Sequence, residues 1–559
     1  MKLTSIPKTW KHIKRYRHII TILLKYGFSD IVNVISSDLI LRFGEKFVPR
    51  IGHIKAKTKS RAERLRMVFE ELGPTFIKVG QMLSMRPDIL PPEYLIELQK
   101  LQDNVAPLPF EEIKKIIEEK SNQELKNKLK LIDEKPVASA SIAQVHTGVL
   151  KDGTKVVLKI QRPNIREIIQ TDMEILSDLA KIVKKYLKDQ LAVDPTLVVK
   201  EFNKMIINEL NFLHEGRNIL KFKNYFKNEP TIYIPTYFQE LSNENIIVME
   251  YIDGIKHVNR EKLIKHGLNP EIIARNAIRL SMMQIFDFGF FHADPHAGNI
   301  IILKNNVISL IDFGNIGYID QETMGYLADL LIGYIKNDIR KIMRSLELLN
   351  IIDSTTNIED IKYAISLLIN EFTNINLSTV SIKELSREIH SLVYNYHLKF
   401  PTKLSLMLKA LITAEGFGEM LFPEIDIISE IKPHVKTLIR KRYSPIRKIQ
   451  NMFTNLDEVV LLIEDLPEKT RDILSKMATG KLSIIFEHRN LDGLVKGLNK
   501  AGSRLSSSLI IASLIIGSSI IIQLPIGYKL FGYPIIGIVG YILAFILGLR
   551  LLWDIYKNK

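Results

Sequence analysis

The chain has 559 residues, of which 46% are hydrophobic and 25% are charged, so it can bury a sizeable core and is not globally disordered. This length exceeds one ordinary domain and predicts two or three folded units, and the net charge is +15. The chain contains no cysteine, which excludes disulfides, thiolate metal sites and cysteine nucleophiles and fits a reducing compartment.

The N-terminal segment, residues 1–56, has the pattern of a basic amphipathic helix. Residues 1–66 contain 16 Lys and Arg but 4 Asp and Glu, so most of the net positive charge lies there. Such a segment suits nucleic acid or an anionic membrane surface. Apolar residues at helical spacing favour anionic membrane lipids, and not nucleic acid, as the partner of this segment. The alternative is a basic helix that packs on the protein itself. The apolar residues are Trp10, Ile13, Ile20, Leu23, Leu24 and Phe28.

The following elements predict an α+β protein. Residues 57–130 alternate charged and apolar residues at helical spacing between prolines, which predicts several helices. Two β-rich runs then flank Asp152-Gly153, which predicts a hairpin. A second strand pair is expected from Thr231–Ile234 and Ile246–Tyr251.

Helical patterns occupy the remaining central part of the chain. They run over Ile165–Leu187 and Asp194–Phe226, and again over most of the chain from Glu271 to about Lys441. A polar, charged linker is expected at residues 441–504.

Two apolar runs within residues 505–553 predict a transmembrane helical hairpin. Ser506–Leu524 is 19 residues long without a charge, enough to cross a hydrocarbon core of about 30 Å, and Ile535–Leu549 is the second span. Lysines and arginines flank the pair on both sides, so the large soluble portion is expected to face the cytoplasm. The prediction is therefore a multi-pass protein of the cell membrane; the alternative is a buried hairpin in a soluble protein.

The segment from His292 to Gly314 carries the sharpest chemical signal. A kinase catalytic loop needs an Asp that orients or deprotonates the acceptor and an Asn five positions later that holds magnesium, and Asp294 and Asn299 have this spacing. A short apolar hairpin is expected across Asn305-Asn306. It leads to Asp312-Phe313-Gly314, whose Asp can ligate the metal that bridges the phosphates.

The segment also allows two other interpretations. His292, Asp294 and His296 alternate along an extended chain and could form a metal-ligand cluster, because alternate strand residues share one face. Asp312-Phe313-Gly314 could also be an ordinary turn. The kinase-like residues upstream of this segment, described next, argue against both a metal cluster and an ordinary turn.

A kinase also needs a strand lysine for the α- and β-phosphates and a helical glutamate that orients it. Lys159, at the end of Val157-Leu158-Lys159, fits the lysine, and Glu215 is the candidate partner. Glu215 lies 56 residues after Lys159, which implies an inserted element such as the helix at Ile165–Leu187. Taken singly, either residue would more often be a surface side chain.

Two further segments complete the predicted nucleotide site. Glu250 and Tyr251 follow a strand-like run and suit a hinge whose backbone meets adenine. The position of the phosphate-covering loop holds alanines where an ordinary kinase has glycines. Alanine restricts the backbone more than glycine does, so this loop must approach the phosphates differently from a glycine-rich loop. This loop consists of Ala138, Ser139, Ala140 and Ser141.

From about Lys57 to Pro423, the sequence closely resembles the UbiB (AarF-domain) family of atypical kinase-like proteins. The resemblance rests on the alanine-rich loop, on Lys78-Val79-Gly80-Gln81 and on the loop from His292 to Asn299. The family usually has Glu-x-Asp shortly before its helical glutamate, whereas this chain has Glu209-Leu210-Asn211.

The resemblance implies a protein-kinase-like two-lobe fold with a helical N-terminal extension and the C-terminal transmembrane hairpin. The extension would be residues 57–130, the N-lobe 131–255 and the C-lobe 256–440. It also implies ATP and Mg²⁺ as cofactors, and a cap over the active site formed by Lys78, Gly80, Gln81 and Glu209.

The resemblance further implies an ATPase rather than an efficient protein kinase, one that supports the biosynthesis or transport of isoprenoid quinones or related lipids. Its partners would be isoprenoid lipids or quinone-pathway proteins. The alternatives are a protein or small-molecule kinase and a non-catalytic nucleotide-sensing scaffold. The residues expected to carry the chemistry are Asp294, Lys159 and Glu215, with Asn299 and Asp312 as metal ligands.

Overall fold

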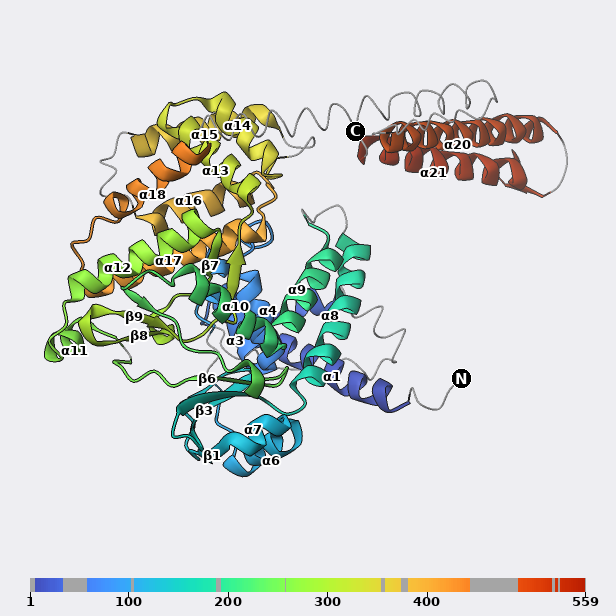
Figure 1. The fold of residues 1–559 in the computed structure, drawn as a ribbon. Helices are drawn as coiled ribbons and strands as arrows, with labels where there is room; N and C mark the ends of the chain where they lie inside the picture. Colours follow the sequence, from blue (N-terminus) through green and yellow to red (C-terminus); the bar gives the residue numbers. More distant parts are fainter. Residues whose placement is uncertain are drawn as a thin grey trace, which may run out of the picture. The chain divides into compact units, whose positions relative to one another are not determined.

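The computed structural model describes residues 6–33, 58–101, 105–187, 193–256, 258–352, 357–373, 381–442, 491–524, 528–530 and 533–557. The chain divides into two compact units, residues 1–450 and residues 451–559. The first unit contains a sheet covered by helices, followed by a larger helical region (Figure 1). The second unit contains the C-terminal helical hairpin.

The N-lobe is built around an antiparallel sheet in the order β1-β3-β4-β6, with β2 paired to β3. The predicted hairpin is β3–β4, and Gly153 in its turn has φ +90°, a conformation that glycine adopts without steric cost. Helices α6 and α7 pack on one face of the sheet through a buried apolar cluster. The bounds are β1 Leu129–Ile132, β2 Ala138–Ser139, β3 Ala143–Leu150, β4 Lys155–Gln161, β6 Ile246–Glu250, α6 Phe110–Lys120 and α7 Gln123–Lys128.

The predicted pairing of the strand at Thr231–Ile234 with the strand at Ile246–Tyr251 is wrong. β5 (Ile232–Tyr233) pairs parallel with β9 (Ile308–Leu310) in a separate sheet, whereas β6 pairs with β4. Four successive residues of β6 are buried, so both faces of this strand are covered. Ile246 and Val248 pack in the cluster with α6 and α7, whereas Ile247 and Met249 pack in the main core. Short apolar runs carry no information about which strand they will pair with, because the choice depends on packing.

Helices α8 (Ile165–Leu187) and α9 (Pro195–Glu209) account for the long separation between Lys159 and Glu215. They precede α10 (Phe212–Tyr225), which carries Glu215. The side chain of Asn211 accepts a hydrogen bond from the Leu213 amide and so caps the N-terminus of α10.

The basic helix α1 (Ile6–Lys25) packs on α3 (Arg61–Leu72) and α8. Ile20 and Phe28 are 1% exposed, and Arg15 forms an ion pair with the buried carboxylate of Asp172. The alternative of a helix packed on the protein itself is therefore confirmed for the described part of its apolar face. The side chain of Trp10 and residues 34–56 lie outside the described part of the chain.

The helical extension contains α3, α4 (Pro74–Leu83) and α5 (Pro92–Leu98), and prolines begin α4 and α5. Gly80 lets these helices approach closely, because a Cβ there would lie 2.3 Å from the Leu101 side chain.

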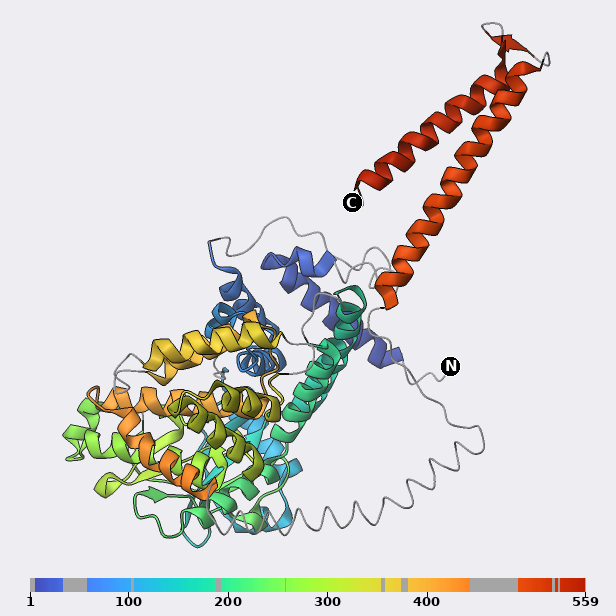
Figure 2. The same ribbon diagram turned by 90° about the horizontal axis from the view of Figure 1, so that it is seen from above.

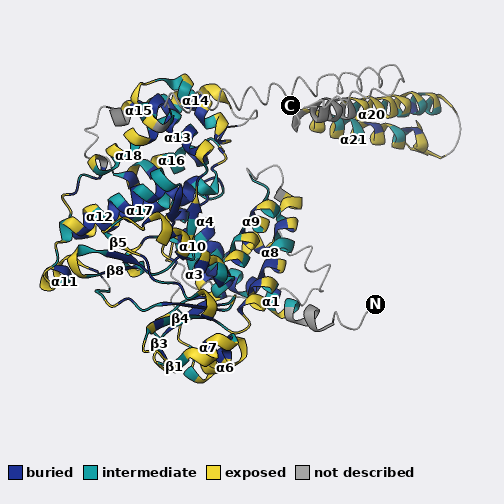
Figure 3. Cartoon of the chain, viewed as in Figure 1, coloured by how far each residue is buried: buried dark blue, intermediate teal, exposed yellow. Residues whose placement is uncertain are grey.

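The C-lobe is mainly helical, and two short antiparallel pairs, β7–β10 and β8–β9, carry the catalytic segments. The β8–β9 turn has positive φ at Asn305 and Asn306, which asparagine tolerates. Helices α12 and α17 pack together, and α17 is largely buried (Figure 3). The bounds are α11 Arg260–Lys265, α12 Pro270–Met282, a π-helical turn Met283–Phe288, β7 Phe290–His292, β8 Ile300–Ile302, β10 Ile316–Tyr318, α13 Gln321–Ile335, α14 Ile339–Leu348, α15 Ile358–Thr373, α16 Ile382–Asn395, α17 Thr402–Leu421 and α18 Ile427–Arg442.

The second unit is a hairpin of α20 (Leu491–Gln523) and α21 (Ile535–Lys557), which pack together beside their connection and spread apart away from it (Figure 2). Two short strands, β11 (Lys529–Leu530) and β12 (Tyr533–Pro534), join them. Ala501–Gln523 and Ile535–Ile555 are long and apolar enough to cross a membrane, and few of their side chains are buried.

Small residues allow the two helices of the hairpin to pack closely. A Cβ at Gly540 would lie 2.1 Å from the Ser518 hydroxyl oxygen, and Ser519 and Tyr541 share a hydrogen bond of 2.6 Å. The helix α20 already begins at Leu491, inside the predicted linker, of which residues 443–490 lie outside the described part of the chain.

Candidate active site

Three predicted site residues from distant parts of the chain meet at one point between the lobes. Lys159 lies on β4, Glu215 on the first turn of α10, and Asp312 two residues after the end of β9. The Lys159 Nζ lies 2.9 Å from both carboxylate oxygens of Glu215 and 3.3 Å from Asp312 Oδ1. This is the lysine–glutamate–aspartate arrangement that a kinase active site requires.

The three charges are unequally buried, and this sets their electrostatics. The side chain of Glu215 is 4% exposed, that of Lys159 14% and that of Asp312 42%. Burial raises the pKa of Glu215 to about 7, opposed by Lys159 and reinforced by Asp312. Burial works against the charge of Lys159, but Asp312 and Glu215 outweigh it and raise the pKa of Lys159. Burial likewise opposes the charge of Asp312, but Lys159 and the Gly314 amide hold the pKa of Asp312 below its ordinary value.

Helix α10 also holds the Asp-Phe-Gly segment. The Asn218 side chain donates to the Phe313 carbonyl at 2.9 Å, and the Phe313 ring is fully buried against Phe222. The Gly314 amide donates to Asp312 Oδ1 at 2.9 Å. These contacts direct the Asp312 carboxylate toward Lys159, so this segment is not an isolated turn.

His292 joins the catalytic loop to the Asp-Phe-Gly segment. Its Nε2 donates to the Asp312 carbonyl at 2.6 Å, and its Nδ1 accepts from the Asp294 amide at 3.0 Å. Burial lowers the pKa of His292, consistent with this neutral tautomer. His296 Nδ1 accepts from the Gly298 amide.

Both ring nitrogens of His292 are engaged with backbone groups, so His292 cannot ligate a metal ion and the proposed three-residue cluster does not form. Within the described residues, no group of three or more His, Cys, Asp or Glu side chains is placed to hold a metal ion.

Asn299 and Asp312 lie at the same end of the β8–β9 hairpin, where the Ile311 amide donates to the Asn299 carbonyl at 3.1 Å. The side-chain nitrogen Nδ2 of Asn299 donates to the Asp294 backbone carbonyl at 3.2 Å, so the side-chain oxygen Oδ1 is the atom available for a cation. One carboxylate and one amide oxygen fit Mg²⁺, which takes few protein ligands and completes its shell with water and phosphate. Bound there, Mg²⁺ would offset the negative charge of the phosphates.

Sequence analysis missed the partner of Asp294. Lys409, on α17, places its Nζ 2.9 Å from Asp294 Oδ2. The two residues are 115 positions apart, and Lys409 stands in an apolar helical pattern without a motif around it. No signal in a single sequence would have identified it.

The alanine-rich loop is held by a second residue that sequence analysis missed, Arg162. Its guanidinium donates to the Ala140 carbonyl at 2.9 Å and to the Ser139 hydroxyl at 2.7 Å. Ala138 and Ser139 pair with β3, and Ser141 is fully buried. Arg162 follows directly on the Lys159 strand, so its position beside the loop could have been suspected.

The predicted hinge residues use their backbone amides within the fold. The Glu250 amide donates to the Thr236 carbonyl, and the Tyr251 amide donates to the Lys155 carbonyl. The Glu250 carboxylate accepts from the Tyr233 hydroxyl at 2.8 Å. Neither amide is therefore available to adenine in this conformation.

The predicted cap residues do not act together: Lys78 and Glu209 form one contact, and Gln81 forms another. Lys78 Nζ lies 2.6 Å from the Glu209 carboxylate at the end of α9, and both side chains are largely buried. Gln81 instead donates to the Leu101 carbonyl at 3.2 Å, while Gly80 serves helix packing. Lys78 is thus tied to the segment that leads into α10 and Glu215.

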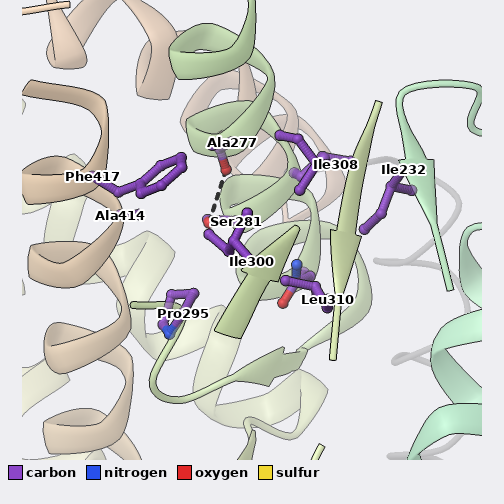
Figure 4. Close-up of a pocket in the computed structure, with 11 residues that line it drawn as sticks. Ile232, Ala277, Ser281, Pro295, Ile300, Ile308, Leu310, Ala414 and Phe417 are labelled. Atoms are coloured by element: carbon purple, nitrogen blue, oxygen red, sulfur yellow. Dashed lines mark hydrogen bonds between the residues drawn. The ribbon is translucent and has the colours of Figure 1, made fainter. Parts of the chain in front are cut away.

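An apolar cavity lies behind the catalytic loop, between α12, α17 and the strands β8 and β9 (Figure 4). Its lining includes Pro295 of the loop, Ala277 of α12, and Ala414 and Phe417 of α17. None of the predicted site residues lines it, so it is distinct from the predicted nucleotide site.

Comparison with known proteins places this arrangement in a family. Residues 100–346 match the ABC1 atypical kinase-like domain, residues 365–426 the UbiB helical domain and residues 489–557 the ABC1/UbiB kinase-like C-terminal domain. A protein of Aliivibrio fischeri named probable protein kinase UbiB is 30% identical over 481 residues, 85% of this chain and 87% of the relative. The chain belongs to the UbiB family of atypical kinase-like proteins.

Two further relatives of this UbiB-family protein match nearly its whole length. A protein of Photobacterium profundum named probable protein kinase UbiB is 29% identical over 94% of this chain and 97% of the relative. An uncharacterized protein from the hydrogenase 1 5′ region of Clostridium pasteurianum is 34% identical over 98% of this chain and 99% of the relative. The α+β, protein-kinase-like fold predicted from the sequence is confirmed.

The domain boundaries have a consequence for the site. Lys159, Glu215, Asp294, Asn299 and Asp312 all fall in the ABC1 domain, whereas Lys409 falls in the UbiB helical domain. The helical domain therefore contributes a side chain to the candidate active site.

Proposed function

We propose that this protein is a membrane-anchored ATPase that supports the biosynthesis or transport of isoprenoid quinones or related lipids. The observation that carries the ATP-dependent part is the contact of Lys159 with both Glu215 and Asp312, beside the oxygen ligands suited to Mg²⁺. The lipid part rests on the family resemblance and on two helices long enough to cross a membrane.

Each residue has a defined role in this proposal. Lys159 binds the α- and β-phosphates and Glu215 orients it, while Asp312 and Asn299 hold Mg²⁺. Asp294 positions a water molecule for attack on the terminal phosphate. The contact between Lys78 and Glu209 holds the cap helix α4, which favours water over a bulky acceptor.

The proposal is tested with the full chain in vesicles of anionic phospholipid, in the presence of ATP labelled on the terminal phosphate. We expect magnesium-dependent release of label as inorganic phosphate, stimulated by the anionic lipid. Label on protein or on an added small molecule would support the kinase alternative, consistent with the relatives named probable protein kinase UbiB. Tight nucleotide binding without turnover would leave the scaffold alternative.

We also propose that the hairpin spans the cell membrane twice with the catalytic unit in the cytoplasm, as the flanking lysines and arginines indicate. Because the chain has no cysteine, single-cysteine variants report topology directly. In intact cells, Tyr528→Cys, in the hairpin connection and 90% exposed, should react with a membrane-impermeant maleimide. Lys151→Cys, in an exposed turn of the N-lobe sheet, should react only after permeabilisation. The reverse labelling pattern would contradict the orientation.

A further inference from the structure

We propose that Lys409 is a second phosphate-binding cation of the active site, which holds Asp294 and contacts the terminal phosphate of the nucleotide. This inference rests on the proposed use of ATP and adds a residue from outside the kinase-like domain. The geometry behind it is the 2.9 Å contact between Lys409 Nζ and Asp294 Oδ2. The two side chains are 27% and 31% exposed, so the pair is open to an entering ligand.

The chemistry of phosphoryl transfer favours such a cation. Charge spreads over the three outer oxygens of the transferred phosphoryl group, and lysine or arginine side chains commonly stabilise it. Lys159 already contacts two carboxylates. The loop from Asp294 to Asn299 contains no lysine or arginine, and neither does the alanine-rich loop at residues 138–141. Lys409 supplies a positive charge next to Asp294 from another part of the chain.

The position of α17 does not depend on the Lys409 contact. At its N-terminus, the Thr402 hydroxyl donates to Glu201 at 2.6 Å and Lys403 pairs with Asp320 at 2.8 Å. Further along, Ala414 and Phe417 are buried against the core behind Pro295 (Figure 4). A partly exposed ion pair adds little to stability, so the Lys409–Asp294 contact is better explained by a role at the site.

The reach of a lysine fits this role. Its charge is compact and stands on a flexible four-carbon stem, so Nζ can remain near Asp294 while it turns toward a neighbouring oxygen. The nucleophile that Asp294 orients must approach the terminal phosphorus, so the outer phosphate oxygens lie next to this carboxylate during transfer. Lys409 would bind ATP through an oxygen that ADP lacks.

The test compares Lys409→Met with Lys403→Met in the full chain, in vesicles of anionic phospholipid. For Lys409→Met we expect kcat to fall about 100-fold and the affinity for ATP about tenfold, with the affinity for ADP unchanged. Lys409→Arg should recover much of kcat, because the positive charge is retained. Lys403→Met removes an ion pair on the same helix, away from Asp294, and should leave kcat and the preference for ATP over ADP unchanged.

Each outcome decides the inference. Equal loss of ATP and ADP affinity in Lys409→Met would overturn it, because that result would indicate a structural role. A kcat equal to that of Lys403→Met would overturn it as well, because Lys409 would then contribute nothing to phosphoryl transfer. If the unaltered protein binds ATP but releases no phosphate, the proposed ATPase fails while the inference is still decided by the ratio of the two affinities. A ratio that Lys409→Met leaves unchanged would then refute it.

Discussion

Asp312→Asn should lower magnesium-dependent ATP hydrolysis by about 10³-fold, a loss of transition-state stabilisation of about 4 kcal/mol. Asparagine keeps the size of the side chain but removes the negative charge that holds Mg²⁺ and pairs with Lys159 at 3.3 Å. The measurement is phosphate release as a function of magnesium concentration, together with nucleotide binding without magnesium. The magnesium concentration for half-maximal rate should rise, while magnesium-free binding should change little.

Asp320→Asn is the matched control for this variant. Asp320 also pairs with a lysine, Lys403, but it caps the N-terminus of α13 instead of facing the nucleotide site. Its substitution should reduce stability and leave the magnesium dependence as it was. A residual rate in Asp312→Asn within tenfold of the unaltered protein would show that Asp312 is not a metal ligand in hydrolysis.

Glu215→Gln should lower kcat by about 100-fold, because Lys159 loses the carboxylate that orients it toward the phosphates. The Glu215 side chain is 4% exposed and its two oxygens bind Lys159 at 2.9 Å, so the substitution leaves a buried ammonium group with Asp312 alone. The free energy of unfolding should fall by about 3 kcal/mol. Turnover and chemical denaturation are the two measurements.

The pH dependence gives Glu215 a distinct signature. Burial raises its pKa to about 7, so the folded protein takes up a proton as pH falls through this value. Activity that needs the ionised carboxylate should therefore rise with pH through about 7, whereas the stabilisation from proton uptake is lost as pH rises from the ordinary value of 4.5 to about 7. Glu215→Gln should abolish this limb of the pH–rate profile, and persistence of the limb would assign it to another group.

Glu229→Gln controls for the loss of a carboxylate elsewhere. Glu229 accepts two hydrogen bonds from Arg279 at 2.8 and 3.0 Å, and its side chain is 15% exposed. This variant should lose stability while the rise of activity with pH is retained.

Local sequence determined the parts of this protein that depend on spacing and on backbone preference. The separation of Asp294, Asn299 and Asp312 predicted a catalytic loop, a hairpin and a metal ligand in series, because a short hairpin brings both of its ends together. Asp152-Gly153 predicted the β3–β4 turn, and the turn has the positive φ that glycine permits. The two long apolar runs predicted two helices, since uncharged residues of this number suit a hydrocarbon core.

Tertiary structure decided what depends on surfaces that meet only after folding. The apolar face of α1 suits a membrane or a protein surface equally, and the neighbouring helices α3 and α8 cover it from Tyr16 to Ile22. The two-residue strand β5 joined β9 rather than β6, since strand partners are chosen by packing. Lys409 reached Asp294 only because α17 packs behind the catalytic loop, and an ion pair between residues 115 positions apart leaves no pattern in the sequence.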